Sequence, residues 1–544
     1  MQNQFDYIVV GGGSAGCVLA ARLSENPDTR VCLIEAGGHG NGMLVRMPIG
    51  IAATVPGQIA PGINYAYKTG PQPGLNGRQG FQPRGRALGG SSAINAMVYM
   101  RGHQKDYDAW AEMGCTGWSY DDVLPYFIKS EYNQRGASKF HGGDGPLQVA
   151  DQYEPRPISR AFLAAAEACG VPTVDDLTTP NTHGAALNQV HQFHDERRGE
   201  RCSVAAAYLF PVQSRPNLHV MTKSLVQRVL IKDGRAYGVK VRHRSKSTTL
   251  TARNEVILSG GAFNSPQLLM LSGIGPAEHL KEHGIVPMVD APEVGQNLQD
   301  HPDYVSAYKT TTTDVFGVGV MGAVHLIKGL MRWRRDGTGI PSSPLAEVSA
   351  FFGSSPEFDD WPDIQLQFVV AMLVDHGRRI LPGYGVSCHG CLLRPKSRGS
   401  VTLATGNASD APLIDPQFLS EDEDLERLTQ GVKKMHEIMS AAPMAAHIKS
   451  QLFLTGGEND DALKASIRAR TDSVYHPVGT CRMGSDEASV VDTDLKVRGV
   501  AGLRVVDASV MPVIISGNTN AATVMIAEKA AETIVQSARI AQPT

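Results

Sequence analysis

The stretch Tyr7-Ile-Val-Val-Gly-Gly-Gly-Ser-Ala-Gly16 decides the fold of this chain. Four apolar residues, as in a buried parallel strand, run directly into a turn that contains Gly11, Gly13 and Gly16. Apolar residues at helical spacing follow the glycines, and a second apolar strand then ends in Glu35. A strand, a glycine turn, a helix and a second strand in this order predict a βαβ unit at the start of a nucleotide-binding domain.

The glycine turn is suited to a dinucleotide. Its glycines permit a tight turn, close approach of a pyrophosphate and close packing of helix on strand. Ser14 and Ala15 open the helix, whose N-terminus offers free N–H groups and a positive dipole end to phosphates. Glu35, followed by Ala36, lies 19 residues after Gly16, where an acceptor for ribose hydroxyls is expected. A glycine turn that serves packing alone is the alternative, and it leaves Glu35 unexplained.

Composition limits the class of protein. The chain has 544 residues, which predicts two or three domains or one large interleaved pair. Hydrophobic residues make up 42% and charged residues 19%, a globular composition that excludes a disordered or fibrous chain. The formal net charge of -3, without long blocks of one sign, lacks the basic footprint of nucleic-acid binding. We therefore expect no nucleic-acid partner.

Two strand patterns predict two sheets. Apolar runs at residues 255–260 and 503–507 are typical of further buried parallel strands. Alternating or turn-bounded strands, typical of an antiparallel sheet, are expected at residues 363–370, 384–393 and 400–403, and a helix over 421–439 is expected to pack on them. The predicted fold class is α/β plus α+β, with a Rossmann-like domain interleaved with a second domain built on an antiparallel sheet flanked by helices.

The chain is expected to leave the nucleotide-binding domain and return to it twice. The predicted limits of that domain are residues 1–148, 201–302 and 469–540. Residues 149–200 and 303–468 are predicted to form the other domain, which would bind the substrate.

Eight scattered cysteines fit a reducing compartment better than a disulfide scaffold. The first residues show no basic, cleavable signal segment, and no run of 18 apolar residues occurs. We expect a cytoplasmic location.

Three further segments resemble signatures of one family. They are Gly85-Arg-Ala-Leu-Gly-Gly-Ser-Ser-Ala-Ile-Asn95, Gly261-Ala-Phe-Asn-Ser-Pro266 and Tyr475-His-Pro-Val-Gly-Thr480, the last followed by Ser516-Gly-Asn-Thr-Asn520. In this order they resemble the glucose–methanol–choline (GMC) oxidoreductases, which are FAD-dependent and mostly oxidise alcohols. The resemblance extends over essentially the whole chain and is strongest to the bacterial alcohol and choline dehydrogenases.

The resemblance implies a set of FAD contacts in addition to the glycine turn, Glu35 and Ala36. These are Ala87, Gly90, Ser91, Asn95, Ala96, Met97, Val98, Val226, Asp507, Ala508, Asn520 and Ala521. Covalently flavinylated relatives carry a histidine directly before the position of Asn95, whereas this chain has Ile94. The FAD is therefore expected to be non-covalent.

Oxidation of an alcohol needs a base for the hydroxyl proton while hydride leaves for flavin N5, and neutral imidazole suits that task near pH 7. His476 matches the family's catalytic histidine, and Asn518 matches its partner, whose amide donates to the developing alkoxide. A loop-stabilising role is the alternative for Asn518. His301 is the rival base, but its motif resembles a family segment beneath the flavin domain, so we expect a structural role. No metal site is predicted.

Glu347 is predicted on the wall of the substrate cavity, where its carboxylate would attract a cation such as choline or form an ordinary salt bridge. Met97, Met100 and Trp361 are candidates for the same wall or for the core. The expected substrate is a neutral primary alcohol, aliphatic or benzylic, with choline as the alternative.

The expected electron acceptor is a quinone or a similar compound. The basic amphipathic stretch Leu326–Arg335 would give at most peripheral contact with the inner membrane. An oxidase that reduces dioxygen is the second hypothesis, and a non-redox hydroxynitrile lyase that keeps FAD as a structural group is the third. The sequence predicts no oligomeric state.

Overall fold

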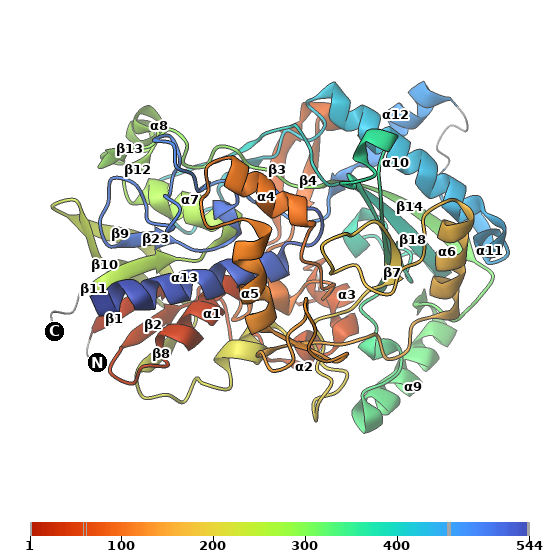
Figure 1. Cartoon of the computed structure of the whole chain (residues 1–544), viewed down its shortest axis with the longest axis horizontal. Coiled ribbons are helices and arrows are strands. Elements are labelled where there is room, and N and C mark those ends of the chain that lie inside the picture. The colour runs from red at the N-terminus through yellow and green to blue at the C-terminus, as the bar shows by residue number, and fades with distance from the viewer. Residues whose placement is uncertain (1–2, 58, 61, 454–458, 541–544) are drawn as a thin grey trace.

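The computed structural model describes residues 3–57, 59–60, 62–453 and 459–540 (Figure 1). Its first sheet contains the predicted βαβ unit. The strand order is β8-β2-β1-β11-β10-β9, with β23 beside β11. These strands are β1 (Gln4–Val10), β2 (Val31–Ile34), β8 (Leu218–Met221), β9 (Ser224–Lys232), β10 (Arg235–His243), β11 (Lys246–Leu258) and β23 (Leu503–Val505). β1 pairs in parallel with β2 and β11, as expected for its buried strands, whereas β10 pairs antiparallel with β11 and β9, so the sheet is mixed.

The second sheet is antiparallel throughout, with the strand order β21-β14-β18-β17-β16-β7. Its strands are β7 (Gly184–Leu187), β14 (Pro302–Thr310), β16 (Ala346–Phe352), β17 (Ile364–Val369), β18 (Gly383–Leu392) and β21 (Ile448–Gln451), with β15 (Gly317–Val318) and β22 (Asp472–Ser473) at its margins. The predicted helix, α10 (Asp422–Ser440), packs on β18 and β17 through a buried side that includes Leu428, Val432 and Met435.

One predicted strand does not join this sheet. Residues 400–402 form β19 (Ser400–Thr402), which pairs only with β20 (Leu413–Asp415). The turn before β19 is fixed at the start of α10, because Asp424 accepts hydrogen bonds from the backbone N–H groups of Lys396 and Ser397. That attachment directs the chain away from β18.

The other elements cover and connect the two sheets. The helices are α1 (Ser14–Leu23), α2 (Met43–Arg46), α3 (Ile51–Thr54), α4 (Gln104–Glu112), α5 (Tyr120–Ser130), α6 (Pro157–Ala168), α7 (Gly261–Leu271), α8 (Ala277–Glu282), α9 (Val320–Asp336), α11 (Ala442–Ala445), α12 (Asp460–Arg470) and α13 (Asn520–Ile540). The small strands are β3 (Tyr67–Gln72), β4 (Arg78–Gln82), β5 (Glu131–Asn133), β6 (Leu147–Val149), β12 (Ile274–Gly275) and β13 (Val289–Asp290). Across the described ranges, every helix is too short or too polar to cross a bilayer.

The chain moves between the two sheets as it proceeds. The first sheet takes strands from the start, the middle and the end of the chain, and the second sheet takes strands from the intervening segments. Figure 1 shows α13, in blue, lying along the first sheet close to red α1, although the two helices are at opposite ends of the sequence. The predicted fold class is confirmed, and the domain limits stay a prediction.

Candidate functional site

A single large cavity joins the predicted site residues. It has a volume of about 1280 Å³ and extends from the glycine turn after β1 to His476 and Asn518, with walls from both sheets. Its size exceeds the range of roughly 300–1,000 Å³ that is typical of small-molecule pockets, so it can hold a cofactor together with a substrate.

The glycine turn forms one end of the cavity. The atoms around each glycine show whether a side chain would fit there. Gly11 has φ +104°, and a Cβ there would lie 2.3 Å from the carbonyl oxygen of Ser259. A Cβ at Gly16 would lie 1.9 Å from the carbonyl oxygen of Gly11. At Gly13, by contrast, a Cβ would meet only the Ser259 oxygen, at 3.8 Å. The space beside Gly13 therefore belongs to the cavity and is available to a phosphate group.

Helix α1 starts at this turn with free backbone donors. Its N-cap, Gly13, makes no capping hydrogen bond through a side chain, and Ser14 and Ala15 line the cavity. The buried hydroxyl of Ser259, also on the wall, has no hydrogen-bond partner among the described residues. These unsatisfied donors suit an anionic ligand with several acceptor oxygens.

Two buried carboxylates shape the walls. Glu35 accepts hydrogen bonds from the backbone N–H groups of Gly12 (2.9 Å) and Gly37 (2.7 Å), and burial raises its pKa. Asp507 accepts from the N–H of Gly261 (2.8 Å) and the hydroxyl of Ser265 (2.6 Å). Both side chains face the cavity while they fix the loops beside it.

Most of the predicted cofactor residues lie on the cavity wall. They are Gly11, Gly13, Ser14, Ala15, Glu35, Ala36, Gly90, Ser91, Asn95, Ala96, Met97, Val98, Val226, Asp507, Ala508 and Asn520. Gly16, Ala87 and Ala521 do not line it. Gly16 packs inside the turn, Ala87 bridges to Gly38 behind the wall, and Ala521 is buried in the first turn of α13. In the structure these three support the wall, and their contact with FAD stays a prediction.

The predicted catalytic pair lies at the other end of the cavity, in hydrogen-bond contact. Asn518 Nδ2 is 3.1 Å from His476 Nε2, and Gln367 of β17 holds the amide by donating to Asn518 Oδ1 at 3.4 Å. On its far side, His476 Nδ1 is 3.1 Å from His301 Nδ1. His301 is fully buried and does not line the cavity, yet it contacts His476 directly.

These contacts fix which nitrogen of His476 carries the proton. An amide NH₂ only donates, so Nε2 of His476 must accept from Asn518. A neutral imidazole has one N–H, which leaves Nδ1 as the donor to His301. The lone pair of His476 Nε2 therefore points to the cavity wall beside the Asn518 amide. That is the arrangement of a base next to a hydrogen-bond donor.

Electrostatics keep His476 neutral. Burial lowers its pKa well below 6.5, and the neighbouring His301 and the Arg84 guanidinium lower it further. Burial also lowers the pKa of His301 to about 3, against backbone acceptors at Leu393 and Ile515 that raise it. Asp300 positions the backbone by accepting from the N–H of His476 at 2.8 Å. The unprotonated form needed in a base is thus the resident form at neutral pH.

The prediction for Glu347 is wrong. Its side chain is completely buried on β16 and does not line the cavity. Both carboxylate oxygens are occupied, by the N–H of Arg156 (2.6 Å), the hydroxyl of Ser159 (2.8 Å) and the hydroxyl of Ser343 (2.9 Å). Glu347 instead caps the start of α6, where a negative charge is favourable.

Among the cavity carboxylates that the sequence did not indicate, which include Asp375 and Asp472, Asp303 lies on the second sheet. It lines the cavity from β14 and pairs with His389 of β18, whose Nδ1 lies 2.6 Å from Asp303 Oδ2. Gln367 was also missed. A polar residue in an alternating strand is a signal that could have indicated Gln367, but the alternation does not say which face of the strand meets the cavity. Met97 lines the cavity, whereas Met100 and Trp361 do not.

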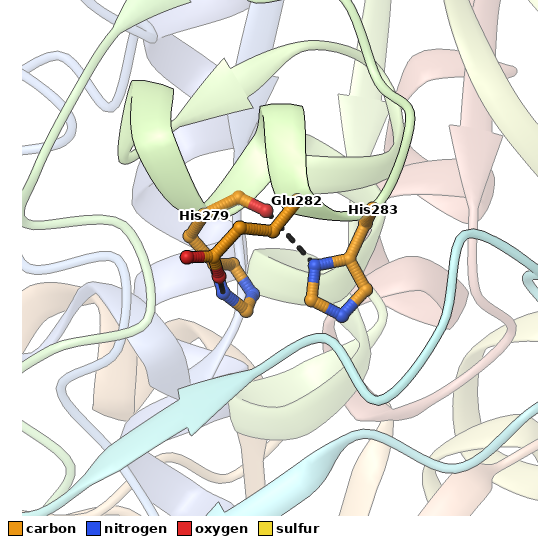
Figure 2. Close-up of side chains that lie close together, drawn as sticks. All are labelled: His279, Glu282 and His283. Atoms are coloured by element: carbon orange, nitrogen blue, oxygen red, sulfur yellow. Dashed lines mark hydrogen bonds and ion pairs between the residues drawn. The ribbon is translucent and has the colours of Figure 1, made fainter.

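Within the described residues, one group of potential metal ligands is close enough to share an ion: His279, Glu282 and His283 (Figure 2). Its geometry does not favour metal binding. His279 Nε2 accepts a hydrogen bond from the N–H of Leu403 at 3.0 Å, so Nδ1 must carry the proton in the neutral ring. Metal binding through Nδ1 would require His279 to give up that contact. We assign the group a structural role.

Known proteins resemble this chain over nearly its whole length. Residues 5–303 and 395–527 match the N- and C-terminal family models of the GMC oxidoreductases. An alcohol dehydrogenase (acceptor) from Pseudomonas putida is 45% identical over 541 residues, which cover 99% of this chain and 97% of that protein. Mitochondrial choline dehydrogenase from Mus musculus is 41% identical, covering 98% of this chain and 90% of its own.

Among solved structures, a formate oxidase from Aspergillus oryzae RIB40, studied for its FAD modification, has a TM-score of 0.90 and 26% identity. The match covers 99% of each chain. The family and this neighbour support FAD as the cofactor, and the open space at Gly13, the free donors of α1 and the length of the cavity fit it.

Gly13→Val is expected to fold but to lose FAD, because the new side chain has room within the protein yet fills the space that a pyrophosphate needs. Gly42→Val is the matched control. Gly42 also precedes a helix in an extended conformation, and a Cβ there meets nothing within 4 Å, but it lies outside the cavity wall. The ratio of flavin to protein absorbance and the circular dichroism spectrum check both variants. Full flavin content in Gly13→Val would contradict the assignment.

Proposed function

Because this chain belongs to the GMC oxidoreductase family, we propose that it oxidises a primary alcohol to the aldehyde, with His476 as the base and Asn518 as its partner. The observation that carries the proposal is the neutral His476, whose Nε2 lone pair meets the Asn518 amide at the cavity wall. FAD, when bound, supplies the acceptor for the hydride that leaves the alcohol carbon.

The proton has a defined route. The alcohol hydroxyl donates to His476 Nε2, and Asn518 Nδ2 turns its hydrogen bond from the imidazole to the alcohol oxygen. Protonation of Nε2 makes His476 a cation, and its Nδ1–H continues to donate to His301. The products are the aldehyde, one proton on His476 and one hydride on the cofactor.

The cavity wall supports a neutral substrate. On the side of the second sheet it contains many aliphatic residues, which are Leu326, Leu330, Leu345, Ala346, Val369, Met372, Leu373, Ile380 and Leu381. These residues stabilise an alkyl or benzyl group. The carboxylates beside them, Asp303, Asp375 and Asp472, each have a basic side chain within ion-pair distance. We therefore place aliphatic and benzylic primary alcohols before choline.

Choline stays the second candidate because of Asp303. Its carboxylate lies on the cavity wall, and the pair with His389 neutralises it only when His389 is protonated. When His389 is neutral, a quaternary ammonium group near Asp303 would find a negative charge.

The substrate ranking is tested by anaerobic titration of the holoenzyme with butanol, benzyl alcohol and choline at equal concentrations. Butanol and benzyl alcohol are expected to bleach the flavin faster than choline, since the aliphatic wall stabilises their apolar groups. Faster bleaching by choline would reverse the ranking. A flavin that none of these alcohols bleaches would favour the lyase.

The electron acceptor proposed is a quinone, and the protein is proposed to be cytoplasmic with peripheral contact to the inner membrane. Similarity to the alcohol dehydrogenase (acceptor) supports an acceptor distinct from a soluble nucleotide. Turnover with a soluble quinone is expected to exceed turnover in air-saturated buffer by at least about tenfold. Stoichiometric hydrogen peroxide at a comparable rate would identify an oxidase instead.

The FAD is proposed to be non-covalent. Ile94 lies on the cavity wall within a small apolar cluster, and the described cavity wall contains no cysteine. Ile94 has no nucleophilic atom that could form a bond to the flavin. Acid precipitation of the holoenzyme is expected to leave the yellow colour in the supernatant, and colour in the pellet would contradict this.

His476→Ala is expected to keep FAD and to slow flavin reduction by ~10² to 10⁴-fold, the range for loss of a general base. Asn518→Ala should lose less, on the order of 10²-fold, because it removes one donor. His219→Ala is the control: this exposed histidine of β8 lies outside the cavity wall and outside the contacts around His476, so reduction should stay near the parent rate. Stopped-flow absorbance measures all three. A near-normal rate in His476→Ala would transfer the role to another group, with His301 first.

The pH dependence follows from the lowered pKa of His476. A base must be unprotonated, so activity is lost as pH falls through its pKa. Since burial, His301 and Arg84 hold that pKa well below 6.5, the rate of flavin reduction should stay constant on acidification through 6.5 and fall only at lower pH. Stopped-flow reduction of the holoenzyme across the acid range checks this. A midpoint at or above 6.5 would mean that His476 is not the titrating base.

A further inference from the structure

Helix α9 has an apolar face that points away from the protein. Of the sixteen large apolar side chains that are exposed in the described part of the chain, six lie within residues 318–331. Val320, Val324, Ile327 and Met331 recur at helical spacing, and Ile327 and Met331 are 59% and 61% exposed. Figure 1 shows α9 at the edge of the molecule, projecting away from the other helices. A solvated helix would carry polar residues on this face.

An adjoining face of α9, about 100° around the helix from Ile327 and Met331, belongs to the cavity. Leu326 and Leu330 lie on the cavity wall. One helix therefore separates the proposed substrate space from the outside and is apolar on both sides.

The cavity reaches the surface beside α9. Val318 and Ile380 line the cavity and are 38% and 65% exposed. Val318 of β15 pairs with Gly383 at the start of β18, three residues after Ile380. Ile59, 66% exposed, is a third lining residue of this kind, in the loop whose Pro56 packs near Gly377. The opening is thus rimmed by apolar side chains that continue the outward face of α9.

Cations flank this apolar surface. Lys328 and Arg334 lie on either side of the exposed stripe of α9, and Arg379 lies next to Ile380 at the opening. Among the described residues, none of the three has a carboxylate within ion-pair distance, although many other surface cations do. An apolar stripe between unpaired cations is the pattern of a helix that lies in the interface of an anionic bilayer.

We propose that the outward face of α9, with Val318, Ile59 and Ile380, docks on an anionic phospholipid surface and opens the substrate cavity directly to the apolar layer. The inference rests on the proposed function in one respect: an apolar alcohol and a lipid-soluble acceptor would enter from the bilayer. It goes beyond the peripheral membrane contact proposed above, because it names the surface that docks and the direction in which the cavity opens.

A second copy of the chain fits this surface less well. In a two-fold dimer each residue of the patch would face the same patch of the partner. The unpaired Lys328, Arg334 and Arg379 of one copy would then face the same cationic patch of the other, and like charges across an interface are unfavourable. An anionic lipid headgroup supplies the opposite charge to all three.

The test is sedimentation of the holoenzyme with vesicles of phosphatidylcholine, with and without phosphatidylglycerol. Ile327→Glu/Met331→Glu is expected to bind mixed vesicles at least about tenfold more weakly, because two apolar contacts become anions. Lys328→Gln/Arg334→Gln should weaken binding roughly fivefold for each cation and remove most of the dependence on phosphatidylglycerol. Val286→Glu/Leu413→Glu is the matched control, since these apolar side chains are 76% and 57% exposed on other parts of the chain.

The outcomes separate this inference from the proposed function. Flavin content and dye-linked oxidation of a water-soluble alcohol, measured without vesicles, should be unchanged in every variant. If the parent protein does not oxidise the alcohol, the proposed function is contradicted, while the vesicle result still stands. Equal vesicle binding by the α9 and control variants, or no binding by the parent, would overturn the docking surface. A parent dimer that Ile327→Glu/Met331→Glu converts to monomers, without vesicle binding, would assign the face to a second copy.

Discussion

The start of α13 is tied to the start of α1 by a hydrogen bond from Ser14 Oγ to Asn520 Oδ1, 2.7 Å long, between residues 506 positions apart. Further along the same two helices, the buried carboxylate of Glu528 accepts from Arg22 and Tyr208. These contacts bring the last segment of the chain against the glycine turn. Because Asn518 lies two residues before Asn520, the same attachment places the partner of His476 within the cavity that the turn begins.

The site depends on burial as much as on contact. Two adjacent histidines in water would titrate near pH 6.5, and the pair would often carry a proton. Here burial lowers the pKa of both His301 and His476 and keeps them neutral, and the neighbouring His301 and the Arg84 guanidinium lower the pKa of His476 further. The one N–H of His476 then points to His301, because the Asn518 amide occupies the other side. A base is obtained without a carboxylate in contact with the imidazole.

The substrate side of the cavity is chemically simple. Its aliphatic wall continues through Leu326 and Leu330 to α9, whose other face is apolar and exposed. The carboxylate of Glu347 is absent there, since Glu347 lies on the opposite side of its strand, where it holds the start of α6. Asp303, Asp375 and Asp472 do reach the wall, and Asp303 and Asp472 are paired with His389 and His376. The proposed selectivity for apolar alcohols and the proposed access from a bilayer therefore both rest on the aliphatic part of one wall.

The sequence by itself determined the βαβ unit and the antiparallel segments, because those features depend on local spacing: glycines at fixed intervals and apolar runs. Short motifs indicated the catalytic candidates through their resemblance to those of a family. It did not determine which face of a strand meets the cavity. Glu347 of β16 and Gln367 of β17 lie in two strands of one sheet, yet only Gln367 lines the cavity. The contact between His301 and His476, 175 residues apart, likewise arises only when β14 and the segment after β22 pack together. Register and packing between distant segments fix such contacts, and no local pattern encodes them.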